Sequence, residues 1–278
     1  MKTSYVGSLL FATAIGVSLA LFGQAWSATP PEALSPQQRA DAPVRGSVWL
    51  DKNGKLTWPG VLREQNIKRG LAGPIGVLFY GDALPHGWIF RRHLEHDSGK
   101  EFFARQKMYK KYYGKWHPAN FAQGDASTLQ LLQNATDGEF DGISPKVVVL
   151  EAGGDSLASS TAKTILSDDT KIVAAIRARE PHTKILIVGL FPFGRNPKAA
   201  DVIRGRAKIA YVNQGLAKLD NGTTIRFLNL NAKFLQSNGA PIKGVFAKGF
   251  YLNGLYLTNK GYKIWAEGMQ PLLAEMMK

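Results

Sequence analysis

Residues 146–157 read KVVVLEAGGDSL, an apolar run that ends in two glycines and an aspartate. Three consecutive valines followed by a leucine are typical of a parallel strand that is buried on both faces. Similar apolar runs stand at residues 75–81, 184–192 and 224–231, and helical patterns lie near residues 168–180 and 201–220. This alternation predicts an α/β protein: a three-layer α/β/α sandwich with a mostly parallel sheet, of the flavodoxin-like type.

A sheet of this kind also predicts where chemistry takes place. Ligands bind beyond the carboxyl ends of the strands, which points to the loops after residues 75–81 and 146–153. A last helix is expected after Thr258, a good N-cap residue. Its apolar side chains then fall on one stripe, formed by Tyr262, Trp265, Met269, Leu272, Leu273 and Met276.

The first 27 of the 278 residues are typical of a secretory signal peptide. Lys2 precedes an apolar run over residues 6–22, and small residues stand at the expected cleavage site, Ala25-Trp26-Ser27. We therefore expect an exported protein, periplasmic or extracellular. An uncleaved N-terminal membrane anchor is the alternative.

The remaining chain divides into three predicted parts. Residues 28–45 are rich in proline, alanine and polar residues, which favours a flexible linker. Residues 46–69 contain two alternating runs around Asn53-Gly54, a pattern that predicts a hairpin extension. Residues 70–278 then form the main domain.

The composition limits the partners and cofactors. Cysteine is absent, which excludes disulfides and thiol chemistry. Lysine and arginine outnumber aspartate and glutamate by 35 to 21, and the formal net charge is +14. For an exported protein, this charge favours anionic phospholipid head groups or acidic cell-wall polymers over nucleic acid, although it also serves simple solubility. We expect no cofactor, and the composition leaves the oligomeric state open.

Four blocks of sequence follow one another along the main domain. They read VLFYGDALPHGW (77–88), ANFAQGD (119–125), DGISPKVVVLEAGGDS (141–156) and LNGLYLTNKGYKIWAE (252–267). In this order they resemble the blocks of the SGNH or GDSL hydrolases, and most of all those of the bacterial relatives of the platelet-activating factor acetylhydrolase catalytic subunits. The resemblance covers about residues 70–278 and implies the same three-layer fold.

The resemblance also implies which residues stand at the catalytic positions, and almost none is of the family type. These positions fall on Ala83 (nucleophile), Gly124 (oxyanion-hole glycine), Asp155 (oxyanion-hole asparagine), Asn253 (triad aspartate) and Tyr256 (triad histidine). Only Gly124 is the residue that the family has, and no intact catalytic set remains. The literal string Gly-Asp-Ser-Leu at residues 154–157 stands in the third block, so Ser156 is displaced from the nucleophile position by a whole strand and loop.

These substitutions close the family's reaction. Ala83 has no atom that could attack an acyl carbon. Tyr256 is protonated at neutral pH and cannot replace an imidazole base, and no histidine follows His182. An ionised Asp155 would repel the developing oxyanion, and only a protonated Asp155 could donate to it.

The sequence therefore predicts a non-catalytic SGNH-fold protein that binds an acylated, glycan or protein ligand through the ancestral cleft. A structural envelope protein with a filled cleft is a further alternative. The residues expected at the cleft are Asp82, Ala83, His86, Gly124, Asp125, Asp155, Ser156 and Tyr256.

Two other site chemistries remain open. His86 with Ser156 or Ser127 could form a relocated Ser–His pair, which would make the protein an active ester hydrolase or acyltransferase of the GDSL lipase and acetylesterase class. The carboxylates of Asp82, Asp125, Asp155 and Glu151 could bind a hard cation such as Ca²⁺. We expect no metal site, because nothing else in the sequence supports one.

Residues 105–116, RQKMYKKYYGKW, interleave basic and aromatic side chains. Such a mixture suits an anionic membrane or cell-wall surface. The alternative is an amphipathic helix with aromatic residues in the core and lysines in water. The predicted surface consists of Arg105, Lys107, Tyr109, Lys110, Lys111, Tyr112 and Trp116, with Lys115 and Tyr113 in the same stretch.

Overall fold

The computed structural model describes residues 52–90, 98–194, 196–247 and 256–278, which all belong to one compact unit, Glu32–Lys278. The expected signal peptide, the linker and the first arm of the expected hairpin lie outside the described residues, as does Asn253. Within the described ranges, no helix is long and apolar enough to cross a membrane.

The described residues form a parallel sheet of five strands in the order β2-β1-β3-β4-β5. The strands are β1 (Val77–Gly81), β2 (Ala119–Asn120), β3 (Val147–Glu151), β4 (Lys184–Val188) and β5 (Ile225–Leu228). Four of them were predicted from their apolar runs, and the parallel α/β fold is confirmed. β2 was not predicted as a strand, because two residues carry no periodicity.

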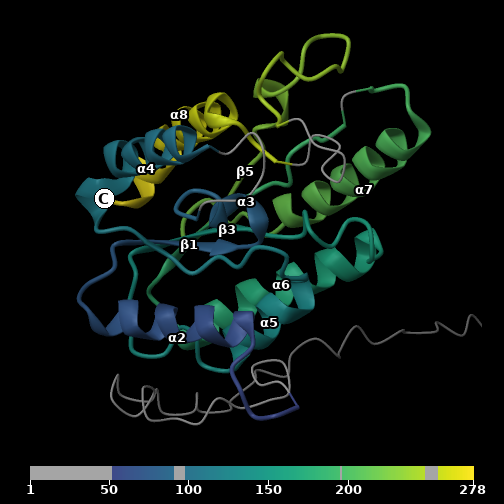
Figure 1. The fold of residues 1–278 in the computed structure, drawn as a ribbon. Coiled ribbons are helices and arrows are strands. Elements are labelled where there is room, and N and C mark those ends of the chain that lie inside the picture. Colours follow the sequence, from purple (N-terminus) through teal and green to yellow (C-terminus); the bar gives the residue numbers. More distant parts are fainter. Residues whose placement is uncertain (1–51, 91–97, 195, 248–255) are drawn as a thin grey trace, which may run out of the picture. The chain divides into compact units, whose positions relative to one another are not determined.

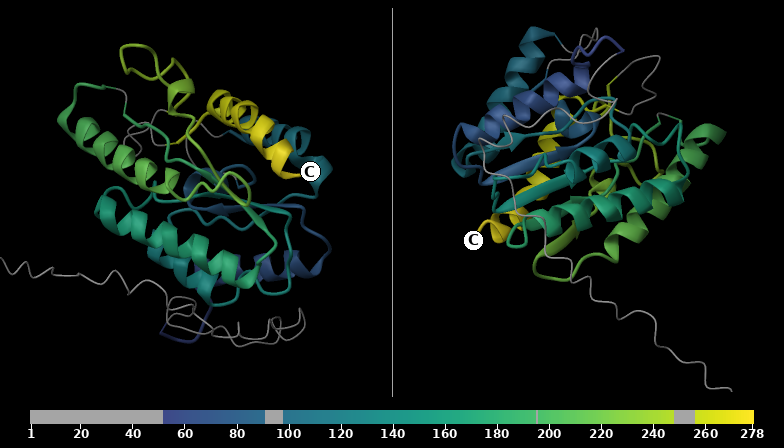
Figure 2. Two further views of the ribbon diagram at one scale, coloured as in Figure 1. Left: turned by 180° about the vertical axis from the view of Figure 1, so that it is seen from behind. Right: turned by 90° about the horizontal axis from the view of Figure 1, so that it is seen from below.

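Helices cover both faces of the sheet (Figures 1 and 2). Val77 and Phe79 of β1 point into one core cluster, which lies under α4 (Gly99–Tyr113) and α8 (Asn259–Met276). Leu78 and Tyr80 point into the other cluster. That cluster lies under α5 (Thr128–Thr136), α6 (Ala162–Arg179) and α7 (Ala200–Ala217). The alternation of side chains along one strand thus fills both cores. The shorter helices are α3 (Ala83–His86), η1 (Gly114–Trp116) and η2 (Asn231–Lys233).

Helix α8 begins where the sequence predicts. The hydroxyl of Thr258 accepts a hydrogen bond from the backbone N–H of Gly261 at 3.3 Å, as an N-cap does. Five residues of the predicted stripe are buried and Leu272 is half-buried. The last block of the resemblance therefore packs its helix onto the same face of the sheet as α4.

The expected hairpin extension over residues 46–69 is wrong from residue 58 onward. The turn at Asn53-Gly54 is present, with Gly54 at a φ of 76°. Residues 58–71 instead form helix α2 (Trp58–Leu71), which is capped by Thr57. Pro59 stands in the first turn of α2, where a missing N–H breaks no helical hydrogen bond, whereas in a strand it would remove a donor from the ladder.

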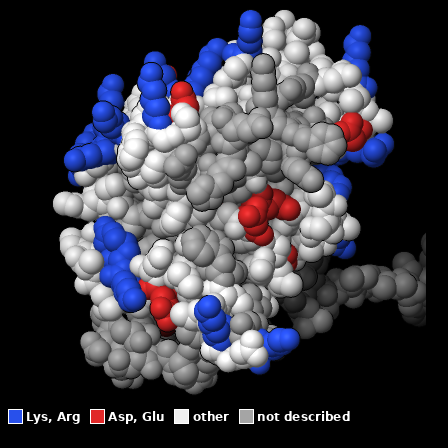
Figure 3. Space-filling view, viewed as in Figure 1, with Lys and Arg blue, Asp and Glu red and all other residues white. Residues whose placement is uncertain are grey.

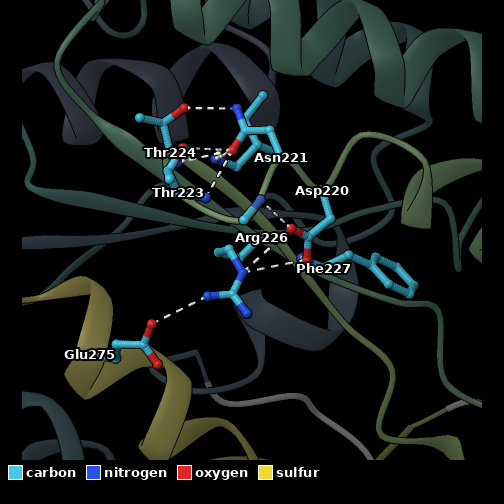
Figure 4. A network of polar contacts seen from close by, with 9 residues as sticks. Asp220, Asn221, Thr223, Thr224, Arg226, Phe227 and Glu275 are labelled. Atoms are coloured by element: carbon cyan, nitrogen blue, oxygen red, sulfur yellow. Dashed lines mark hydrogen bonds and ion pairs between the residues drawn. The ribbon is translucent and has the colours of Figure 1, made fainter.

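The open edge of β5 is covered by the turn that precedes it (Figure 4). On that side of the strand, the N–H of Ile225 donates to Oδ1 of Asn221 at 3.0 Å, and the N–H of Phe227 donates to Oδ2 of Asp220 at 2.9 Å. The guanidinium of Arg226 forms ion pairs with both Asp220 and Glu275 of α8. These side chains occupy donors that an exposed edge strand would offer to another chain.

Candidate functional site

The carboxyl ends of β1, β2 and β3 place three loops side by side. The N–H of Gln123, after β2, donates to the carbonyl of Gly81 at 2.8 Å, and the N–H of Asp82 donates to the carbonyl of Glu151 at 3.3 Å. Gly81 has a φ of 144°, and a Cβ there would lie 1.7 Å from the Glu151 carbonyl oxygen. Only glycine allows the loops after β1 and β3 to approach so closely.

Ala83 stands at the first position of α3, directly after β1. Its side chain is 1% exposed and belongs to the core cluster that faces α4 and α8. The resemblance assigns the nucleophile to this position. The structure therefore presents a methyl group, and no hydroxyl, at the end of β1.

The carboxylate of Asp155 is bound by backbone N–H groups from both neighbouring loops. Its Oδ2 accepts from the N–H of Ala83 at 3.1 Å and from the N–H of Asp125 at 2.9 Å. Asp125 adopts a left-handed φ of 63°. Backbone donors that converge on one point form an anion-binding site, and here the anion is a side chain of the same protein.

The resemblance assigns the second backbone donor to Gly124, but the structure supplies the donor from Asp125, one residue later. Gly124 lies against His86 instead. A Cβ on Gly124 would stand 2.9 Å from Nδ1 of His86. Glycine at this position lets the loop after β2 pass close to the imidazole.

Asp82 holds the loop after β3 in place. Its Oδ2 accepts from the N–H of Gly153 at 2.8 Å and from the N–H of Asp155 at 3.2 Å. Asp82 itself is 1% exposed. This pair of bonds fixes the backbone of Asp155, and thereby the place of its carboxylate.

Asn120 is a site-forming residue that the sequence analysis missed. Its Nδ2 donates to the carbonyl of Pro85 at 2.7 Å, and its Oδ1 accepts from the N–H of Ala122 at 3.0 Å. It therefore fastens α3 to the loop after β2. Its position in the ANFAQGD block was a usable signal, since a buried amide at a strand end usually serves such contacts.

His86 is buried and stacks on Phe90, with ring centroids 4.1 Å apart. Ser156 is 0% exposed, and its Oγ accepts from the N–H of Thr128 at 3.0 Å. Ser127 is the N-cap of α5 and forms a capping box with Gln130. Both serines thus bond near the N-terminal end of α5, and Ser156, a residue expected at the cleft, is fully buried.

Tyr256 is also buried, at 8% exposed, within the core cluster under α4 and α8. Its carbonyl accepts from the N–H of Ala247 at 2.8 Å. The chain is thereby directed into the N-terminus of α8. Its neighbour in the resemblance, Asn253, lies outside the described residues.

Two acidic side chains lie beneath the site. Glu151 and Asp169 are each 1% exposed, and their carboxyl oxygens have no hydrogen-bond partner among the described residues. Burial raises the pKa of Glu151 well above its usual range, and the charges of Asp82, Asp155 and Asp169 raise it further. Burial likewise raises the pKa of Asp169, helped by Asp82 and Asp168. Both groups are therefore stabilised in the neutral form.

A cation site built from these carboxylates is not what the structure shows. In the part of the chain that is described, no three acidic or histidine side chains are placed to hold a metal ion. Asp155 and Asp82, two of the four carboxylates considered for Ca²⁺, each direct one oxygen at backbone donors.

The basic and aromatic stretch over residues 105–116 is split between core and surface. Arg105 is 4% exposed and donates to the carbonyls of Gly87 and Phe90, and Tyr109 and Tyr113 lie in the core. Tyr112 and Trp116 are half-buried, and the lysines are exposed. Arg105, Tyr109 and Tyr113 are therefore not part of a surface, because one side of α4 must cover β1.

Comparison with known proteins agrees with this fold. Residues 79–264 match the model of the GDSL-like Lipase/Acylhydrolase family. The platelet-activating factor acetylhydrolase IB subunit alpha2 of Rattus norvegicus is 27% identical over 186 residues, which cover 66% of this chain and 75% of that protein. The Gallus gallus subunit alpha2 is 28% identical over 183 residues, with the same coverage.

Solved structures give the same result at lower identity. A candidate acylhydrolase from Bacteroides fragilis superposes with a TM-score of 0.60 at 16% identity, covering 81% of this chain and 100% of that chain. A GDSL-like lipase from Bacteroides thetaiotaomicron superposes with a TM-score of 0.57 at 14% identity, covering 77% and 97%. At this level of identity, the likenesses show that the fold is shared.

Proposed function

Because this chain belongs to the GDSL-like lipase/acylhydrolase family, we propose that it retains the family's scaffold as an exported binding protein and has lost the serine reaction. The observation that carries this proposal is the hydrogen bonding of Asp155. Its carboxylate takes up the N–H groups of Ala83 and Asp125, the two donors that converge at the end of β1. Acyl transfer needs such donors free for a developing oxyanion.

Two further features of the site support the loss of hydrolysis. Ala83 offers no nucleophile, and losing the serine alone lowers kcat of a serine hydrolase by about a million-fold. The alternative nucleophile Ser156 is buried, and its oxygen is bonded to the N–H of Thr128. The structure thus offers no support for a relocated Ser–His pair, and we do not propose an active hydrolase.

The ligand that we propose is an acylated molecule, a glycan or a protein, bound where the family binds its substrate. The loops that carry Ala83, Asp125 and Asp155 are joined to one another by hydrogen bonds between neighbouring strand ends. Export is proposed from the signal-like residues 1–27. Mass spectrometry of protein secreted by a bacterial host would show a new N-terminus after residue 27 if this is correct.

The test compares the natural chain with a variant that carries the family residues. The variant combines Ala83→Ser, Asp155→Asn, Asn253→Asp and Tyr256→His, and both proteins are assayed with p-nitrophenyl esters of increasing acyl length. We expect no turnover by the natural chain above the uncatalysed rate, and turnover by the restored variant.

Turnover by the natural chain would overturn the proposal. The variants Ser156→Ala and Ser127→Ala would then identify the nucleophile, because the activity would disappear with one of them. A phosphonyl adduct in the intact mass of the natural chain, formed when a serine displaces the leaving group of a phosphonate ester, would contradict the proposal in the same way.

A further inference from the structure

The outward side of α4 carries a stripe of lysines around one exposed phenylalanine. Its positions are spaced by three, four, three and one residues, which places them on one side of a helix. All are exposed, and Phe103 is 60% exposed. We call this the α4 stripe, and it consists of Lys100, Phe103, Lys107, Lys110 and Lys111.

The acids among the described residues do not form ion pairs with the lysines of the α4 stripe. Within the described residues, none of its four lysines forms an ion pair. Glu101 is the acid of α4, and it points to α8, where its Oε2 accepts from Nδ2 of Asn259 at 2.6 Å. Glu267 of α8 accepts from Tyr112 and pairs with Lys263. Figure 3 shows the resulting concentration of lysine and arginine side chains over the region of α4 and α8.

The lysines of the α4 stripe do not stabilise the helix. Lys107 lies three and four residues before Lys110 and Lys111, and like charges at these spacings destabilise a helix. Lys100 stands in the first turn, where the helix dipole disfavours a positive charge. The inner side of α4 supplies the packing instead, through Tyr109 and Tyr113 in the core.

The exposed ring of Phe103 favours an anionic bilayer over a soluble polyanion as the partner. A soluble polyanion interacts with the lysines, but has no apolar layer for a phenyl ring. A bilayer with anionic lipids offers phosphates to the ammonium groups and an apolar layer just below them. The half-buried ring of Phe102 lies beside that of Phe103, with centroids 5.6 Å apart.

We propose that the α4 stripe is a peripheral attachment surface for bilayers that contain anionic phospholipid. The lysines supply charge, and Phe103 enters the boundary between head groups and acyl chains. This inference is independent of the proposed loss of hydrolysis, because α4 supplies no residue to the Asp155 site.

Flotation with vesicles tests the proposal on the purified full chain. Vesicles of phosphatidylcholine alone are compared with equimolar phosphatidylglycerol and phosphatidylcholine. The test variant replaces Lys100, Lys107, Lys110 and Lys111 with glutamine. The matched control replaces four exposed lysines elsewhere, namely Lys163, Lys171, Lys198 and Lys218. Both variants keep the same N-terminal segment and the same net charge, so they differ only in where charge is removed.

We expect the natural chain to bind the anionic vesicles, and to bind less as salt is raised. The α4 variant should lose about tenfold or more of its vesicle partitioning, given the contribution of each lysine near an anionic surface. The control should stay within about twofold of the natural chain. Phe103→Ser should weaken vesicle binding but leave binding to dextran sulfate unchanged, whereas Ile203→Ser, at another exposed apolar residue, should affect neither.

Three results would overturn the proposal. The first is absence of binding to anionic vesicles by the natural chain. The second is an equal loss in the α4 variant and the control, which would assign binding to net charge. The third is vesicle binding that does not depend on Phe103 while dextran sulfate binds as strongly, which would indicate a soluble polyanion as the partner. Circular dichroism verifies that each variant is folded.

Discussion

Asp155 shows how one substitution changes the chemistry of a given backbone geometry. An amide at this position would present a donor to the end of β1, whereas a carboxylate presents an acceptor. The N–H groups of Ala83 and Asp125 then turn from potential ligand donors into partners of the protein's own side chain. The same backbone that suits an oxyanion therefore suits an internal anion, since both are negative oxygen atoms.

Removal of the Asp155 carboxylate is expected to leave a vacant anion site. Asp155→Ala leaves two backbone donors without this acceptor, and should lower the free energy of unfolding by about 1–3 kcal/mol. Because a small carboxylate can take the same position, acetate should raise the melting temperature of this variant. Differential scanning fluorimetry over an acetate series, at constant ionic strength, measures both effects.

The matched controls are the natural chain and Asp137→Ala, which removes an exposed carboxylate. Neither should respond specifically to acetate. If acetate stabilises all three proteins equally, the two N–H groups do not form an anion site.

The raised pKa of Glu151 makes the stability of the folded protein depend on pH. Burial, followed by the neighbouring acids, raises its pKa in the folded protein above the unfolded value of about 4.3. The folded state then holds a proton that the unfolded state releases, so the contribution is fully present below that pH and is lost as the pH rises. Relative to Glu151→Gln, the natural chain should lose stability between pH 4 and the raised pKa.

Urea unfolding of both proteins at several pH values measures this difference. Glutamine is neutral throughout, so the comparison isolates the proton of Glu151. Parallel stability curves for the two proteins across this pH range would show that Glu151 titrates normally.

At the scale of elements, the edge of the sheet depends on the turn before β5 (Figure 4). Burial alone would raise the pKa of Asp220, but hydrogen bonds from the N–H groups of Phe227 and Gly222, with the charge of Arg226, lower it overall. A lowered pKa means that the ionised form stabilises the fold above the unfolded pKa, and that this contribution is lost as the pH falls.

Asp220→Asn should therefore be less stable than the natural chain at pH 7, with a melting temperature lower by a few degrees, as about 1 kcal/mol of destabilisation would produce. Asparagine keeps an acceptor oxygen and removes the charge. The difference should begin to close as the pH falls below the unfolded pKa of about 4, and should vanish below the lowered pKa of Asp220 in the folded protein. Melting curves at pH 7 and in acid measure it, and a difference that is constant with pH would contradict the assigned role of the charge.

Some sequence patterns predicted the helices and strands of this protein better than others. The buried strands and α8 were predicted because apolar periodicity reports burial directly, over many residues. The hairpin extension was wrong from residue 58 onward because Asn53-Gly54 specifies a turn but does not specify how far a strand continues after it. Pro59 and the cap at Thr57 carried the information that a helix begins there.

At the scale of the whole molecule, the two Gly-Asp motifs illustrate what position in the fold adds. Gly81-Asp82-Ala83 begins at the last residue of β1, and Gly154-Asp155-Ser156 follows the neighbouring central strand β3. The family model matches residues 79–264, so the first of these motifs lies at the start of the match. The literal Gly-Asp-Ser-Leu string lies far inside it, where the burial of Ser156 agrees with a structural role.

The pattern of residues was enough to predict the fold class, four of the five strands, the last helix and the loops where a site is expected. These features follow from hydrophobic periodicity and local turn chemistry, which are properties of neighbouring residues. The contact of Asp155 with the N–H groups of Ala83 and Asp125, which lie 72 and 30 residues away, could be seen only in the folded chain. The folded chain also shows that Arg105 and two tyrosines of α4 lie inside while the lysines lie outside. Such contacts depend on how strands and helices pack, because hydrogen bonds and burial join residues that are distant in sequence.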